Sequence, residues 1–281
     1  MNFTRTPLIS IVTPSLNQFR FLRACVASVE AQPLDAVEQL VIDGGSSDGT
    51  AEYLSGHPGR VGFWRSAPDR GQGDALNIGF ARACGDWIGW QNSDDFYFPG
   101  AFANFLDVIH RFPAARVIIG DVAFVDVDGR ATGSVGVAPV HALRWLEGYW
   151  PYNQGVLIHR EVLDRVGPVD VDLHLHMDTD LLARIAQLAP PVAYIDTVLG
   201  AFRQHSSAKT HMGEDDAHSQ AERALLEARY VRRLWPPRGM ARFQHRLATH
   251  FTRVRGFGPG CLLNRLARRW STAYAGAMVG R

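Results

Sequence analysis

Short apolar runs alternate with amphipathic stretches through the first 120 residues. The apolar runs predict strands, and stretches whose apolar residues recur every three or four positions predict helices. The predicted strands are 8–13, 39–42, 61–65, 87–91 and 116–119, and the predicted helices are 19–31, 50–54, 74–83 and 101–112. Because strand and helix alternate, we expect an α/β fold with a mostly parallel sheet and helices on both faces.

The rhythm changes after residue 120. An Asp128-Gly129 turn predicts a hairpin between 121–126 and 131–137. Further strands are predicted at 154–159, 192–196 and 198–202, and further helices at 161–166, 179–188 and 214–234. We therefore divide the chain into an α/β domain over residues 1–212 and a helical region over residues 213–281.

Small, polar and acidic residues follow the predicted parallel strands at 14–15, 43–44, 69–74 and 92–95. In parallel sheets, ligands bind at the carboxyl ends of the strands. Asp94 and Asp95 follow a buried strand, where carboxylates are costly unless a cation or strong donors meet them. A divalent metal that carries a phosphorylated ligand would meet both. The alternative is an acidic turn closed by Pro99 and Gly100.

Several classes of protein are disfavoured. The chain has neither the glycine fingerprint of dinucleotide binding nor a P-loop, and it has no run of 18 apolar residues. Residues 1–25 lack the features of a secretory signal, and the three cysteines at 25, 84 and 261 lie far apart. These features predict a cytoplasmic protein with reduced thiols.

The net charge of +1 conceals an asymmetry. Residues 220–281 hold 13 arginines and two acids, giving +11, whereas the other 219 residues carry 16 basic and 26 acidic groups, giving −10. A basic, aromatic-containing tail is typical of contact with an anionic membrane surface. The alternative is a helical pair folded onto the acidic body. Nucleic acid is not an expected partner, because no nucleic-acid module is visible.

Four motifs together resemble the family 2 inverting glycosyltransferases of GT-A fold. They are residues 11–18 (IVTPSLNQ), 41–50 (VIDGGSSDGT), 69–79 (DRGQGDALNIG) and 92–95 (NSDD). The resemblance covers about residues 7–210. It implies transfer of a sugar from a nucleotide diphosphate sugar, expected to be a UDP-sugar, to a hydroxyl of a saccharide or lipid-linked acceptor. It also implies a role in synthesis of a bacterial surface polysaccharide, at the inner face of the cytoplasmic membrane if the tail docks there.

The resemblance assigns nucleotide contacts by motif position. These fall on Pro14, Ser15, Asn17, Asp43, Arg70 and Asp74. Asp43 would accept a hydrogen bond from the base. The alternatives are a turn role for Asp43 and a helix-capping role for Asp74.

The resemblance also implies a Mg²⁺ or Mn²⁺ ion that neutralises the leaving diphosphate. Asp95 is the expected direct ligand, Asp94 a ribose or metal-water partner, and His205 a residue that completes the metal shell. Asn92 departs from the family pattern, because many relatives have an acid at this position. Arg203 and Lys209 could meet phosphate oxygens.

Asp178 is the expected general base, since the family places an Asp at the start of a helix in the acceptor half. A helix N-cap is the alternative role for Asp178. Asp180, two residues later, is expected to have a supporting role rather than to act as the base. Four aromatic residues suit either stacking on a sugar ring or core packing: Trp145, Tyr149, Trp150 and Tyr152.

Two rival functions remain. A non-catalytic nucleotide-sugar binder of the same fold would have lost the metal acid or the base, and this chain has candidates for both. A nucleotidyltransferase would carry a glycine-rich basic loop after the first strand, and residues 14–19 have none.

Overall fold

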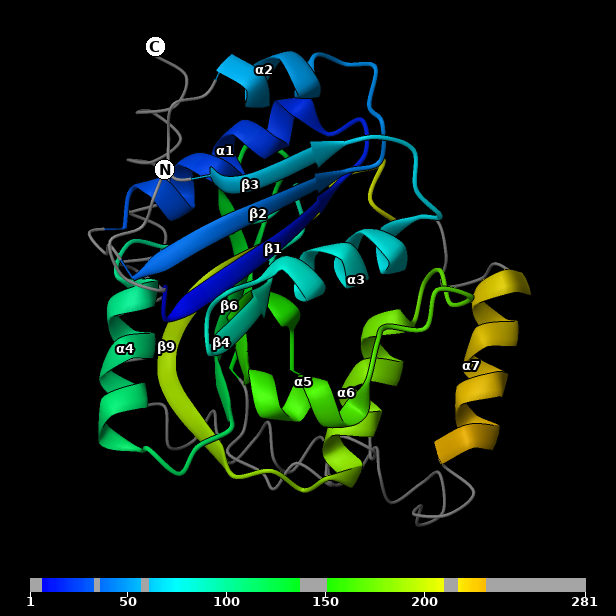
Figure 1. Ribbon diagram of the computed structural model, residues 1–281. Coiled ribbons are helices and arrows are strands. Elements are labelled where there is room, and N and C mark those ends of the chain that lie inside the picture. The colour runs from blue at the N-terminus through cyan, green and yellow to red at the C-terminus, as the bar shows by residue number, and fades with distance from the viewer. Residues whose placement is uncertain (1–6, 33–35, 57–60, 137–150, 210–216, 231–281) are drawn as a thin grey trace.

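The computed structural model describes residues 7–32, 36–56, 61–136, 151–209 and 217–230 (Figure 1). Within them, one sheet has the strand order β3-β2-β1-β4-β8-β6-β9-β5, and β7 pairs with β6. Helices cover both faces of this sheet, and the fold is therefore α/β, as predicted. Of the C-terminal region 213–281, for which membrane docking is predicted, only residues 217–230 are described.

The first half of the sheet is parallel, as expected. It consists of β3 (Val61–Ser66), β2 (Val37–Asp43), β1 (Ile9–Ser15) and β4 (Trp87–Trp90). Every residue of β1, β2 and β4 is buried, because helices cover both faces of these strands. Ser15 pairs with Asp43 at the end of the β1–β2 ladder, so the polar residues after these strands meet at one edge.

The second half of the sheet is mixed. Strand β8 (Val156–His159) runs antiparallel to β4 and to β6 (Val117–Val125), whereas β9 (Val192–Arg203) runs parallel to β6. Strand β7 (Ala131–Val135) forms the predicted hairpin with β6, with Gly129 at positive φ in the turn. The two-residue strand β5 (Phe96–Tyr97), antiparallel to β9, is too short to show a sequence period.

Two pairs of predicted strands are single strands in the structure. Residues 192–196 and 198–202 both belong to β9. The pattern is interrupted between them by a β-bulge, where Ile195 pairs with Gly120 but the next pair is Val198 with Asp121. Likewise 116–119 continues across Gly120 into the hairpin strand as β6. A side chain at 120 would meet Leu199 Cδ1 at 2.2 Å, which accounts for a glycine here. A 3₁₀ turn, η2 (Asn153–Gly155), replaces the start of predicted strand 154–159.

The helices begin and end within a few residues of the predicted bounds. They are α1 (Phe19–Glu30), α2 (Thr50–Gly56), α3 (Gln72–Arg82), α4 (Ala101–Arg111), α5 (Arg160–Val166), α6 (Met177–Gln187) and α7 (Ala217–Tyr230). Phe102, Phe105 and Val108 place the apolar face of α4 in one core, together with Ile9 and Ile11 of the sheet. Helices α3, α5, α6 and α7 contribute to the core on the opposite face.

Helix α7 packs onto the body of the protein. Its buried residues Ser219, Glu222, Leu226 and Tyr230 recur at helical spacing, and Leu226 and Tyr230 belong to the same core as α6. The expected domain boundary at 212/213 therefore precedes a helix that the body partly buries. Most of the expected C-terminal region lies outside the described residues, so the boundary stays a prediction.

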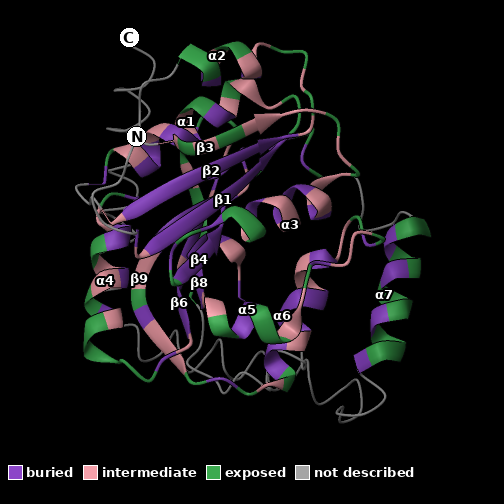
Figure 2. Cartoon of the chain, viewed as in Figure 1, coloured by how far each residue is buried: buried purple, intermediate pink, exposed green. Residues whose placement is uncertain are grey.

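Burial is concentrated in the sheet, while α2 and α7 keep exposed outer faces (Figure 2). In the parts of the chain that the structure describes, every helix is too short or too polar to cross a bilayer.

Candidate active site

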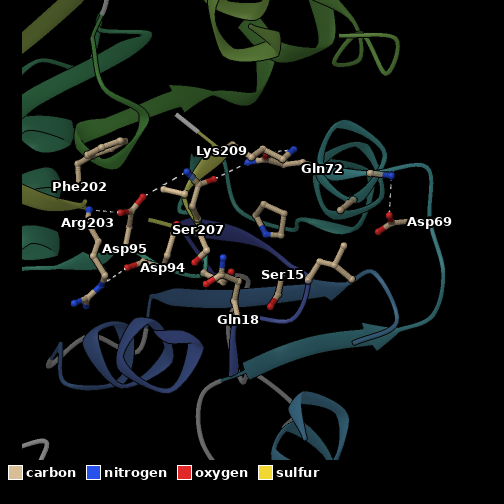
Figure 3. A pocket seen from close by; sticks show the side chains of 17 residues that line it. Ser15, Gln18, Asp69, Gln72, Asp94, Asp95, Phe202, Arg203, Ser207 and Lys209 are labelled. Atoms are coloured by element: carbon tan, nitrogen blue, oxygen red, sulfur yellow. Dashed lines mark hydrogen bonds between the residues drawn. The ribbon is translucent and has the colours of Figure 1, made fainter. Parts of the chain in front are cut away.

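A cavity of about 210 Å³ opens at the carboxyl edge of the parallel strands (Figure 3). Four chain segments surround it: the end of β1, the start of α3, the turn after β4, and the end of β9 with the residues that follow. The lining residues are Pro14, Ser15, Leu16, Gln18, Asp69, Gly71, Gln72, Ala75, Asn92, Ser93, Asp94, Asp95, Phe202, Arg203, Ser207, Ala208 and Lys209. The predicted gathering of polar residues at this edge is therefore present.

Asp95 lines the cavity, but only 1% of its surface is exposed. One carboxylate oxygen accepts from the Arg203 backbone N–H at 2.7 Å, and the other accepts from Gln154 Nε2 at 2.6 Å. Burial, and then the adjacent Asp94 carboxylate, raise the pKa of Asp95 well above its usual value. The expected metal ligand thus has both oxygens bound to protein donors, and its role toward a metal stays a prediction.

Asp94 lines the cavity, and His205 contacts it. His205 Nε2 lies 3.0 Å from Asp94 Oδ2, while its Nδ1 contacts the Ser207 hydroxyl at 2.8 Å. The Phe21 ring packs against the imidazole, with ring centroids 4.7 Å apart. The carboxylate and imidazole are therefore held in fixed orientations, although 111 residues separate them in sequence.

The Arg203 side chain is committed to the turn that carries these acids. Its Nε donates to the Asp94 carbonyl at 2.7 Å and its Nη1 to the Val127 carbonyl at 2.9 Å. The guanidinium also lies over the rings of Phe21 and Phe96. Burial lowers the pKa of Arg203, but nearby carboxylates oppose this effect. These contacts favour a structural role over the suggested phosphate contact.

Lys209 reaches across the cavity toward α3. Its ammonium donates to Gln72 Oε1 at 3.0 Å, and Gln72 Nε2 donates to Asn92 Oδ1 at 2.9 Å. The same Asn92 oxygen accepts from Trp90 Nε1 at 2.7 Å. Asn92, the departure from the family pattern, thus supports the turn through hydrogen bonds. Lys209 lines the cavity, and its contact with a phosphate stays a prediction.

The predicted nucleotide residues divide between the cavity and its rim. Pro14 and Ser15 line the cavity, and the buried Ser15 hydroxyl has no hydrogen-bond partner among the described residues. Asn17, at positive φ, accepts from the Ser47 N–H at 3.1 Å, which joins the loops after β1 and β2. Asp43 is fully buried and accepts from the Ser46 and Ser66 hydroxyls, as in the turn role left open for it.

Arg70 and Asp74 pair with each other at the rim. Arg70 Nη2 lies 3.1 Å from Asp74 Oδ1, and the Arg70 backbone N–H donates to Asp74 Oδ2 at 3.2 Å. Hydrogen bonds from Arg70 lower the pKa of Asp74. Asp74 therefore braces the loop before α3, and neither residue lines the cavity.

Asp178 lies apart from this cavity, in the first turn of α6. It lines a small apolar cavity of about 20 Å³ with Phe80, Trp90 and Leu181. Burial raises the pKa of the half-buried Asp178 carboxyl, although the Thr179 N–H and His176 oppose the shift. The N-cap position is His176, so the capping alternative for Asp178 does not hold. Asp180 is buried and paired within the helix, which fits a supporting role.

The donor set fits part of a metal shell. Asp94 Oδ2 and His205 Nε2 are 3.0 Å apart, near the separation of about 3 Å between adjacent ligands of an octahedral ion with bonds of about 2.1 Å. Oxygen and imidazole ligands are compatible with Mn²⁺. Among the described residues, no group of three or more His, Cys, Asp or Glu side chains is arranged to hold a metal.

Some site residues carry no local sequence signal. Gln154, Phe202 and Ser207 reach the site only through pairings of distant segments. Of the aromatic group expected to stack on sugar or pack in a core, Tyr152 packs edge-on against Phe124 and Phe202 at 5.6 and 6.1 Å. Trp145, Tyr149 and Trp150 lie outside the described residues.

Comparison with known proteins identifies the family. Residues 10–158 match the family model described as Glycosyl transferase family 2. An uncharacterized glycosyltransferase of Mycobacterium tuberculosis is 31% identical over 194 residues, which cover 67% of this chain and 72% of that protein. The O-antigen biosynthesis protein RfbC of Myxococcus xanthus is 28% identical over 238 residues, covering 80% of this chain but 18% of that protein.

Two solved structures share the fold. Residues 1–349 of TarS from S. aureus, in complex with UDP-GlcNAc, match with a TM-score of 0.59 at 15% identity, over 74% of this chain and 61% of that chain. The mannosyltransferase PcManGT from Pyrobaculum calidifontis, in complex with GDP-Man and Mn²⁺, matches with a TM-score of 0.55 at 18% identity, over 99% of this chain and 77% of that chain. Both support the GT-A arrangement of the sheet.

Proposed function

This chain belongs to glycosyl transferase family 2, and we propose that it transfers a hexosyl or N-acetylhexosaminyl group from a UDP-sugar to an acceptor hydroxyl, with inversion at the anomeric carbon. The observation that carries the proposal is the cavity at the strand ends, which Asp94 and Lys209 line and where His205 contacts Asp94 from behind the lining. An acid and an ammonium in a single cavity, with an imidazole beside the acid, suit a diphosphate and its counter-ion.

The nucleotide occupies the part of the cavity formed by Pro14 and Ser15, with Asn17, Asp43, Arg70 and Asp74 shaping the surrounding loops. The unpartnered Ser15 hydroxyl supports this placement, because a buried polar group without a partner is costly until a ligand meets it. A uridine donor is supported by the UDP-GlcNAc complex of the TarS neighbour. Since Asp43 already accepts from two hydroxyls, it would contact the base only if those bonds rearrange.

Asp94 and His205 are the residues that would hold Mg²⁺ or Mn²⁺, with Asp95 fixed behind them. When bound, the ion neutralises charge on the departing diphosphate. The Mn²⁺ complex of the PcManGT neighbour supports this proposal. Lys209 adds a second positive charge from the opposite wall, and Arg203 keeps the acidic turn in place.

Asp178 takes the proton of the acceptor hydroxyl, whose oxygen then attacks the anomeric carbon opposite the departing diphosphate. Its pKa, raised by burial, makes it a better proton acceptor than an exposed carboxylate. The acceptor is a saccharide or a lipid-linked saccharide in bacterial surface polysaccharide synthesis. The similarity to the O-antigen biosynthesis protein RfbC supports this pathway. The reaction would take place in the cytoplasm or at the inner membrane face.

A donor screen tests the proposal. UDP or GDP release is measured for UDP-glucose, UDP-GlcNAc and GDP-mannose with saccharide acceptors, in Mn²⁺ and in EDTA. We expect one UDP-sugar to be turned over in Mn²⁺ only, and the product anomer to be opposite to that of the donor by NMR. Asp94→Ala and Asp178→Asn should each lower kcat by about 100-fold or more.

The matched control is Asp172→Asn, which changes an exposed acid in the loop before α6 and should leave turnover unchanged. Wild-type turnover in both Asp94→Ala and Asp178→Asn would eliminate the site assignment. Tight UDP binding without transfer to any acceptor would instead point to the non-catalytic binder.

A further inference from the structure

Glu222 of α7 is bound to the backbone just before α6. Its carboxylate accepts from three consecutive N–H groups: His174 at 2.6 Å, Leu175 at 3.0 Å and His176 at 2.9 Å. Only 5% of the residue is exposed. Although burial opposes the shift, these three hydrogen bonds lower the pKa of Glu222 below its usual value. The carboxylate is therefore ionised and fully engaged at neutral pH.

These contacts fix the chain where it enters α6. The N-cap residue of α6, His176, makes no side-chain capping bond. Its backbone N–H instead donates to Glu222 of a different helix, 46 residues later in the chain. The negative charge of Glu222 also lies where the helix dipole favours it. The conformation of residues 174–176 is thus set by α7.

A second contact holds the other side of Asp178. Asp180, which is 1% exposed, accepts from the Tyr230 hydroxyl at 2.6 Å and from Arg229 Nη1 at 2.7 Å, both on α7. Asp178 therefore lies between two points that α7 fixes, 174–176 on one side and 180 on the other. Among the described residues, the Asp178 side chain hydrogen-bonds locally, to Thr179.

We propose that Glu222 is a positioning residue for the general base: by holding residues 174–176 it sets where the Asp178 carboxylate meets the acceptor. This inference rests on the proposed function, in which Asp178 takes the proton. Glu222 itself touches neither donor nor acceptor. It also lies near the cavity, since its carboxylate and that of Asp69 oppose the lowering of the Lys209 pKa by desolvation.

The test is a double-mutant cycle in the full chain. Glu222→Ala and Glu222→Gln are each made in the wild-type and Asp178→Asn backgrounds, with Glu227→Gln, an exposed acid on the same helix, as control. In wild type we expect Glu222→Ala to lower kcat by about 100-fold and Glu222→Gln by about tenfold, because a displacement on the order of 1 Å is enough to disrupt proton transfer.

In the Asp178→Asn background, Glu222→Ala should lower kcat no further, because the group it positions is gone. An equal fold-loss in both backgrounds would overturn the positioning role alone, leaving the proposed function intact. Wild-type turnover in Asp178→Asn would overturn both. Hydrogen exchange needs no turnover: amides 174–176 should exchange faster in Glu222→Gln than in Glu227→Gln, and equal rates would also overturn the inference.

Discussion

Asp94 and Asp95 are neighbours in sequence but occupy different environments. Asp94 faces the cavity and His205, whereas Asp95 is buried against the Arg203 N–H and Gln154. Because burial raises the pKa of Asp95, folding favours its protonated form. The cost of keeping Asp95 ionised therefore appears as the pH rises above its unfolded pKa, and it is complete above its folded pKa.

Asp95→Asn should stabilise the metal-free protein at pH 8. The new amide removes the buried charge. Gln154 Nε2 now donates to the oxygen that Nδ2 would replace, so the Gln154 amide has to flip, which turns its Oε1, without a partner among the described residues, toward the Nδ2 donor. We expect a gain in the free energy of unfolding, because the amide has no charge to desolvate when it is buried. Urea unfolding in EDTA from pH 4 to pH 8 measures it, and the gain should shrink toward pH 4. A loss of stability at pH 8 would contradict this account.

At the scale of single residues, the sequence predicted which residues lie at the same edge of the sheet, but not which hydrogen bonds their side chains make. The motifs predicted that Pro14, Ser15, Asp94 and Asp95 share one edge of the sheet, and they do. The orientation of each side chain depends on partners far along the chain. Asp95 is turned inward by Gln154 and Arg203, which are 59 and 108 residues away. No local pattern in residues 92–95 contains that information.

Among the elements, β9 shows how tightly the backbone packs behind the site. A Cβ atom at Gly200 would lie 2.2 Å from the Gln154 backbone carbonyl oxygen. A backbone atom cannot move aside as easily as the end of a flexible side chain. Gly200→Ala should therefore displace Gln154 from Asp95, cost about 1–3 kcal/mol of stability and reduce turnover. The control is Gly133→Ala on β7, where the nearest atom is Phe124 Cδ2 at 3.7 Å. The midpoint of thermal unfolding and kcat are measured for both variants. Equal values in Gly200→Ala and Gly133→Ala would contradict the predicted clash at Gly200.

Helix α7 offers a matched pair of leucines. Leu226 is 6% exposed in the core shared with α6, whereas Leu225 is 47% exposed. Leu226→Ala should lower the free energy of unfolding by about 2–4 kcal/mol, and Leu225→Ala by about 0.5 kcal/mol or less. Urea unfolding measures both. Equal small losses would mean that α7 contributes little to the fold.

At the element scale, periodicity located the helices and parallel strands well, because each carries its own pattern. It missed β5, which has two residues, and divided β6 and β9 at points where Gly120 and a bulge interrupt the pattern. Helix α7 was predicted, but the sequence left open what it packs against. Its contact with α6 depends on Glu222 and Tyr230 meeting residues some 50 positions earlier.

For the molecule as a whole, the charge asymmetry predicts a partner for the basic segment 231–281. We expect the full chain to float with vesicles that contain phosphatidylglycerol, and a chain ending at residue 230 to remain in solution. Each arginine near an anionic surface contributes about 1 kcal/mol, and added salt should release the full chain. A chain that ends at residue 230 still contains all of α7, including the residues that this helix buries. Equal flotation of the two chains would remove the membrane proposal.

The segments that form the cavity wall are synthesised at different times. The walls of the cavity come from residues 14–18 and 69–95, but its last wall, 202–209, leaves the ribosome much later. Until β9 emerges, the Asp95 carboxylate lacks its Arg203 partner and must stay hydrated, so the acidic turn is among the last parts of the growing chain to settle. A stalled nascent chain should therefore acquire affinity for the nucleotide only once Lys209 has cleared the exit tunnel.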